Sequence, residues 1–164
     1  MRYVVPPQNM LGQVDIASIT FDERSRDEIP RLLRGLQYIY CTPELRSEVF
    51  EILKELVPES VSMATGRLGM DLWKILVMGT LRLNCNWDYD KLKDIVDNHK
   101  TIRQMLGHPD FYDCHKYPMQ TIEDNIRLFT PEILGKINSA IVRSGQSLSK
   151  KKRKGSKPDA TALS

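Results

Sequence analysis

The sequence has little cysteine and no long hydrophobic run. Its 164 residues include three cysteines, Cys41, Cys85 and Cys114, at irregular spacing, which is typical of reduced thiols rather than of a disulfide framework. The longest apolar stretch, residues 72–83, is broken by two basic residues and is shorter than the ~20 residues that a membrane span needs. The first ten residues contain no apolar segment of a secretory signal. These absences predict a cytoplasmic protein with no membrane partner.

The sequence also lacks the short motifs of common enzymes. It contains no G-x-x-x-x-G-K-[ST], no G-x-G-x-x-G, no H-E-x-x-H and no G-x-S-x-G. His99, His108, Cys114 and His115 are close in sequence, but no C-x-x-C or H-x-x-x-H pair anchors a zinc site among them. Cys85 lies 14 residues before His99, and we interpret the whole set as one or two buried cysteines and surface histidines. We therefore expect no catalytic residue, no metal and no other cofactor.

One group of carboxylates needs a separate interpretation. Asp90, Asp94 and Asp97 fall on one side of a predicted helix. No histidine or second carboxylate cluster accompanies them, so we interpret this side as a solvated face rather than as a metal site.

The positive charge is concentrated at the C-terminal end. The chain carries a net charge of +3, from 24 Lys and Arg against 21 Asp and Glu. Residues 1–149 hold 18 basic and 20 acidic residues, a net −2, whereas residues 150–164 hold six basic residues and one acidic residue, a net +5. The overall charge therefore says little about whether the body of the protein binds nucleic acid.

Apolar residues at helical spacing dominate the body, and no run of alternating β-branched residues is present. The N-caps Asp27, Thr42, Asp88 and Thr121 mark helix starts. The expected helices cover residues 27–40, 42–57, 70–84, 89–98, 101–106, 121–129 and 131–145. The sequence thus predicts an all-α fold, a compact bundle of about six or seven helices. We expect an extended N-terminal arm over residues 1–24, a helical domain over 25–146 and a disordered basic tail over 147–164.

Three of these helices are compatible with a helix-turn-helix, the candidate being 88–98, 100–106 and then 121–129. In this arrangement Arg would contact phosphates or guanine, and Asn would contact adenine. The candidate DNA-facing residues are Lys100, Arg103, Lys116, Thr121, Asn125 and Arg127. Glu123 and Asp124 on the same helix would repel phosphates, and the pattern alone favours helices that only pack on one another.

The C-terminal tail contains a second candidate for nucleic-acid binding. Its cationic run consists of Lys150, Lys151, Lys152, Arg153 and Lys154. Such a run can bind nucleic acid through the release of counterions, and it is also typical of a nuclear import signal. A solvated end with incidental charge remains the other interpretation.

One long segment resembles a known family. GMDLWKILVMGTLRLNCNWDYDKLKDIVDNHKTIRQMLGH, residues 69–108, is similar to the N-terminal domain of bacterial DDE transposases of the InsH type, with the ISNCY group most similar. The shared features are a hydrophobic helix, a helix of the pattern Tyr/Asp-x-x-Leu, and a Leu-Gly closure at Leu106 and Gly107. Residues 1–40 and 121–138 resemble the family as well, so that the resemblance covers about residues 1–150.

The resemblance implies a DNA-binding role at transposon ends, with this chain or an intact transposase as a further partner. In the family a catalytic domain with three metal-binding carboxylates follows. No residue of this chain corresponds to those carboxylates, so we expect a truncated, non-enzymatic fragment. The alternative is a helical interaction or self-association module, in which the apolar helices of residues 27–57 would pack on another protein or a second copy.

Overall fold

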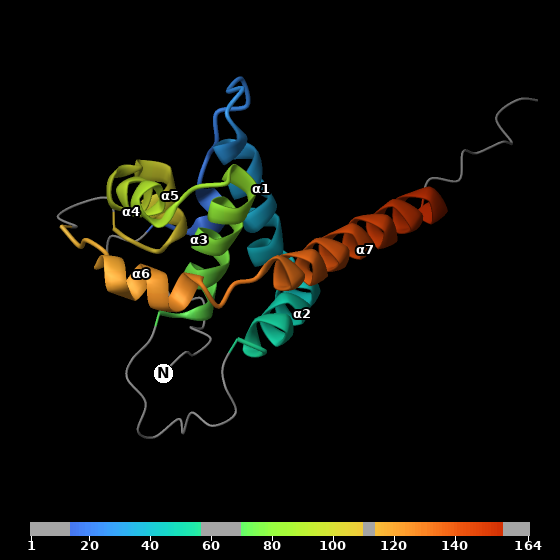
Figure 1. Cartoon of the computed structure of the whole chain (residues 1–164). Coiled ribbons are helices and arrows are strands. Elements are labelled where there is room, and N and C mark those ends of the chain that lie inside the picture. Colours follow the sequence, from blue (N-terminus) through green and yellow to red (C-terminus); the bar gives the residue numbers. More distant parts are fainter. Residues whose placement is uncertain (1–13, 57–69, 110–113, 156–164) are drawn as a thin grey trace, which may run out of the picture.

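The described residues fold into α-helices and one 3-10 helix. A computed structural model of the chain describes residues 14–56, 70–109 and 114–155, with side chains as far as Lys152 (Figure 1). In these three stretches the chain forms no β-strand, which confirms the all-α prediction. The elements are a 3-10 helix η1 (Ile16–Ser18) and the α-helices α1 (Glu28–Cys41), α2 (Pro43–Lys54), α3 (Leu72–Cys85), α4 (Tyr89–Asn98), α5 (Lys100–Met105), α6 (Met119–Ile126) and α7 (Pro131–Gly155).

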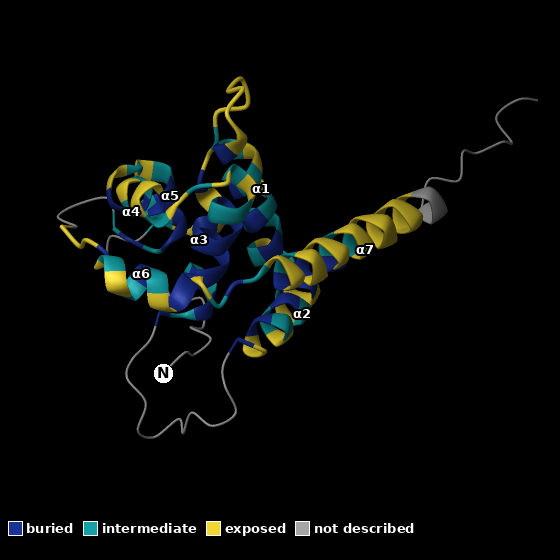
Figure 2. Cartoon of the chain, viewed as in Figure 1, coloured by how far each residue is buried: buried dark blue, intermediate teal, exposed yellow. Residues whose placement is uncertain are grey.

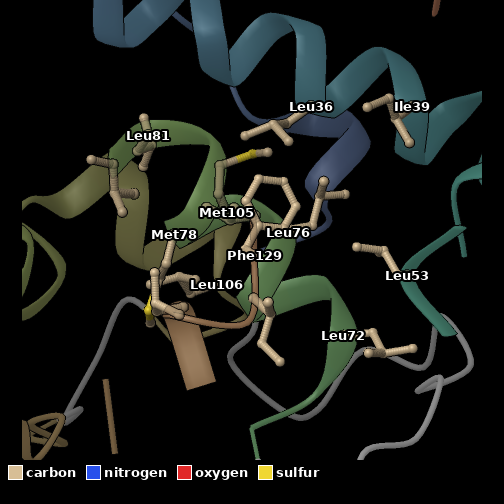
Figure 3. Packing of buried hydrophobic residues seen from close by; sticks show 14 of the residues in the cluster. Leu36, Ile39, Leu53, Leu72, Leu76, Met78, Leu81, Met105, Leu106 and Phe129 are labelled. Atoms are coloured by element: carbon tan, nitrogen blue, oxygen red, sulfur yellow. The ribbon is translucent and has the colours of Figure 1, made fainter. Parts of the chain in front are cut away.

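Helix α3 lies at the centre of the bundle. Residues Ile75–Met78 have no solvent exposure at all, as expected of a helix that is apolar nearly all round. Helices α1, α2, α4 and α6 pack against it. The indole Nε1 of Trp73 donates a hydrogen bond to the carbonyl oxygen of Met105 at 2.7 Å, which ties α3 to the end of α5. Figure 3 shows Leu76, Met105 and Phe129 among the side chains of this core.

Most helix ends follow the predicted chemistry. The carboxylates of Asp27 and Asp88 accept hydrogen bonds from backbone amides in the first turns of α1 and α4, so both predicted N-caps are confirmed. The C-terminal end of α5 closes on Gly107, which has a φ of 88°. The amides of Gly107 and His108 donate to the carbonyls of Gln104 and Arg103. This is the glycine-dependent arrangement that satisfies the last carbonyls of a helix.

The start of α6 differs from the prediction. The helix begins at Met119, and Thr121 lies inside its first turns rather than at the N-cap. Pro118 stands at the N-cap position with extended backbone, and its side chain offers no capping oxygen. Met119 and Gln120 favour helix as much as their neighbours do, so the helix extends upstream to the proline.

The predicted extended arm is only partly correct. Residues 1–13 lie outside the described part of the chain, but the segment that follows packs on α1 and contains η1. Ile16 and Ile19 are buried. The side-chain amide of Gln37 in α1 donates to the carbonyl oxygens of both residues at 2.9 Å. These contacts make residues 14–19 part of the core.

The predicted disordered tail is wrong for residues 147–155, because α7 continues without interruption to Gly155. The apolar stripe of the helix ends at Ile141, but the sequence contains no proline before Pro158. Lys, Arg and Gln are good helix formers, and cations are favourable near the C-terminal end of a helix. Residues 156–164 lie outside the described part of the chain. Figure 2 shows the second half of α7 as an exposed rod that leaves the body.

A glycine in α3, Gly79, allows Phe129 in the segment after α6 to approach the helix closely. A Cβ atom at Gly79 would collide with the ring of Phe129, whereas a Cβ at Gly35 in α1 meets no heavy atom. We expect Gly79→Ala to lower the free energy of unfolding by about 1–3 kcal/mol, because an overfilled core must shift. Gly35→Ala is the matched control and should raise it by up to about 1 kcal/mol through helix propensity. Urea unfolding of both variants measures the difference, and equal effects would contradict the predicted collision.

Candidate nucleic-acid interface

The predicted helix-turn-helix corresponds to α4, α5 and α6. Helix α4 packs against both α5 and α6, and α3 supports α4 and α6. The connection between α4 and α5 is the single residue His99, whose Nδ1 accepts a hydrogen bond from the amide of Ile102 at 3.3 Å. Burial lowers the pKa of His99, while the nearby Asp27 opposes that shift. The helices are thus adjacent as expected, and the question is which of their side chains reach the surface.

The predicted adenine-reading residue is not available for DNA. Asn125 on α6 is only 5% exposed, and its amide Nδ2 donates to the carbonyl oxygen of Thr121 at 2.7 Å. Thr121 is itself half-buried. The face of α6 that the sequence assigned to a base edge therefore points into the protein.

Two of the predicted DNA-contacting cations bind backbone carbonyls at the end of α4. The guanidinium of Arg103 donates to the carbonyl of Val96 at 2.9 Å and to that of His115 at 2.8 Å. The ammonium of Lys116 donates to the carbonyl of Asp97 at 2.9 Å. The last carbonyls of a helix have no partner within the helix, and cations are favourable there. Arg103 and Lys116 thus hold the segment after Cys114 against α4.

Asp97 is the anchor of this arrangement. Its carboxylate accepts a hydrogen bond from Lys93 at 2.6 Å and another from the amide of Tyr117 at 2.9 Å. Lys93 also donates to the carbonyl of Tyr117 at 2.7 Å. Burial raises the pKa of Asp97, but the bonds from Lys93 and Tyr117 outweigh it, and the pKa lies below its ordinary value. The predicted solvated face is therefore wrong for this residue, since Asp97 is 9% exposed.

The sequence contained one signal for this network. Lys93 and Asp97 are four residues apart on one helix, a spacing at which opposite charges meet.

An open hollow of about 280 Å³ lies beside the network and is lined by residues of α4, α5 and the following turn, Lys100 among them. Of the six candidates on the body, Lys100, Lys116 and Arg127 are exposed.

The first half of α7 is attached to α2. Ile133, Ile137 and Ala140 are buried, and the hydroxyls of Tyr38 and Ser144 lie 2.8 Å apart. Lys136 pairs with Glu55 at 2.7 Å and Arg143 pairs with Glu48 at 2.6 Å. Arg143 follows Lys136 by seven residues, whereas its partner Glu48 precedes Glu55 by seven residues. The two helices therefore run in opposite directions, as Figure 1 shows.

The second half of α7 extends past α2. Continuing the register of the two ion pairs brings Leu148 level with Pro43, the first residue of α2. Every described side chain from Gly145 to Lys152 is exposed. No acidic residue occurs between Ile133 and Gly155. The basic run from Lys150 to Lys154 therefore begins past the first residue of α2. It lies on a helix that rises ~1.5 Å with each residue. Side chains are described for its first three members, Lys150, Lys151 and Lys152.

Comparison of the chain with known protein families, with curated proteins and with solved structures finds no match. Among the described residues, no group of three or more His, Cys, Asp or Glu side chains is placed to hold a metal ion. None of the helices in the described stretches combines the length and the apolar character that crossing a membrane requires. The three cysteines are free thiols, with Cys41 and Cys114 at the surface.

The role of Asp97 predicts a pH-dependent loss of stability. We expect Asp97→Asn to lower the free energy of unfolding at pH 7 by about 1–3 kcal/mol, because charge-assisted hydrogen bonds are lost. The folded-state pKa of Asp97 is lowered, so its contribution is present above the unfolded pKa of about 4 and disappears as the pH falls through the folded value. The difference between wild type and Asp97→Asn should therefore shrink below pH about 4.

Urea unfolding at pH 7 and pH 3 measures both quantities. Asp94→Asn is the matched control, because Asp94 is exposed on the same helix and should have little effect at either pH. A penalty for Asp97→Asn that is the same at both pH values would show that the charge of Asp97 is unimportant.

Proposed function

We propose that this chain is a DNA-binding module that contacts phosphates through the basic end of α7. The observation that carries the proposal is the position of the run from Lys150 to Lys154 past the acidic residues of α2, on a helix whose single acidic residue, Glu132, lies in its first turn. Lys and Arg bind phosphate oxygens, and a polyanion gains affinity by releasing its counterions to such a run.

The arrangement favours contacts that do not depend on DNA sequence. Successive residues of an α-helix are about 100° apart, so five consecutive cations surround the helix axis instead of forming one face. Such a rod can approach phosphates from several sides, but it presents no ordered set of donors to a base edge. We therefore assign affinity, rather than sequence recognition, to this end of α7.

A role in transposition rests on the resemblance of residues 69–108 to the N-terminal domains of DDE transposases. Recognition of transposon ends would require a second surface that contacts bases. Lys100 and Arg127 are exposed and remain candidates for it, whereas Asn125 is buried. On this proposal the chain binds DNA, or an intact transposase, and performs no strand cleavage itself.

The interaction module proposed as the alternative has less support. Its apolar helices, residues 27–57, bury their large aliphatic side chains inside the chain, including Leu33, Leu36 and Leu53. Val142 and Leu148 are the large hydrophobic residues exposed in the described part of the chain. Two side chains six residues and about 120° apart on one helix do not form a continuous apolar surface.

The proposal predicts steep salt dependence. Binding to a short DNA duplex, measured by fluorescence anisotropy, should weaken with a slope of up to about −4.5 in log K against log salt if all five cations meet phosphates, or roughly 500-fold between 50 and 200 mM. Replacing all five by Gln, which preserves helix propensity, should abolish most of this binding. The double variant Lys100→Gln, Arg127→Gln is the matched control and should retain it.

The opposite result, with loss of binding only in the Lys100 and Arg127 variant, would place the interface on α5 and α6. Association that is insensitive to salt would instead favour the interaction module. A duplex carrying the terminal repeats of an element, compared with a shuffled duplex, tests the transposition role. Equal affinities for the two would remove end recognition from the proposal.

A further inference from the structure

The two halves of α7 are stabilised very differently. The first half buries Ile133, Ile137 and Ala140 and is attached by two ion pairs and a hydroxyl pair. The second half, from Gly145 onward, has only exposed side chains as far as they are described. In proteins most of the stability of a helix comes from the packing of an apolar face, and this second half has none.

The residues that join the two halves are poor helix formers. Gly145 has no heavy atom near the position of its missing Cβ, and glycine disfavours the helix interior. The hydroxyl of Ser147 donates to the carbonyl of Ser144 at 2.9 Å, a local bond that competes with regular helix formation. Gly145, Ser147 and Ser149 therefore separate the anchored helix from the basic run.

The basic run adds repulsion to this weak connection. Its cations are consecutive, so like charges recur at spacings of three and four residues, for example Lys150 with Lys154. Such pairs destabilise an exposed helix, although the favourable position of cations near the C-terminal end opposes the effect. A polyanion along the helix would neutralise the repulsion.

We infer that the second half of α7 is a binding element whose helix is completed by the phosphates of its nucleic-acid partner, with Gly145 as the point where helix formation is controlled. The inference rests on the proposed function. The structure shows the state in which this helix is formed; on this inference the free chain exchanges between that state and one in which the second half is not helical, and the measured affinity is reduced by the fraction that is helical. A substitution that favours the helix at Gly145, and adds no contact to DNA, should then increase affinity.

The matched pair Gly145→Ala and Gly135→Ala tests this. Both glycines lie in α7 and both have open space around the Cβ position. Gly135 lies in the half that is already held against α2. We expect Gly145→Ala to bind a short DNA duplex about two- to fivefold more tightly than wild type, because alanine favours the helix. Gly135→Ala should bind as wild type does, and Gln146→Gly should bind more weakly by a similar factor.

Circular dichroism at 222 nm provides an independent measurement on the full chain. Long-chain inorganic polyphosphate serves as the probe, because it supplies phosphates and has no chiral signal of its own. Adding polyphosphate to wild type should increase the helix signal. The increase should correspond to on the order of ten residues, the length of helix expected to form. Gly145→Ala should start from a higher signal and show a smaller increase.

The possible failures are distinguishable. If wild type binds DNA with steep salt dependence but Gly145→Ala binds equally well and polyphosphate leaves the signal unchanged, the helix is already complete and the inference is wrong while the proposed function stands. If wild type shows no salt-dependent binding to DNA, both the proposed function and the inference that rests on it are wrong.

Discussion

Helix α3 is apolar nearly all round, so other elements must cover most of its surface, and the rest of the body is arranged by that constraint. Residues Ile75–Met78 have no exposure to solvent. Burying a large aliphatic side chain contributes about 1.5–3 kcal/mol, so the contacts of this one helix supply a large share of the hydrophobic stabilisation. Phe129 lies directly over Gly79, which shows how closely the segment after α6 must approach. The positions of α1, α2, α4 and α6 follow from this requirement.

The helices could be predicted from sequence because their signals are local. Apolar residues repeat every three or four positions, and Asp27 and Asp88 have the short side chains that cap a helix. The end of α7 could not be found in this way. The prediction placed it where the apolar stripe stops, but residues of good helix propensity continue the helix past that point, and the stripe records only which part of the helix is packed.

The candidate site was harder to predict, because the partners of its side chains come from distant segments. Asp97 shares a helical face with Asp94, and only the return of the chain near Tyr117 makes one of them buried and the other exposed. Arg103 has a guanidinium group that could bind a phosphate. In the structure this group instead donates hydrogen bonds to the carbonyl oxygens of Val96 and His115. Residue type indicates which bonds a side chain can form, whereas the fold decides which partner is near.

The basic residues of α7 also share one chemistry but differ in the partners that the fold brings near them. Isolated surface ion pairs contribute only about 0–1 kcal/mol, so Lys136 and Arg143 add little stability through their pairs with Glu55 and Glu48. Their importance lies in the register that they share with the buried stripe of α7. That register brings Leu148 level with Pro43, the first residue of α2, so that Lys150 and Lys151 lie past the acidic residues of α2. Of the seven basic residues on this helix, Lys136 and Arg143 pair with the body, and the run from Lys150 to Lys154 is the part that we propose meets a partner carrying negative charge.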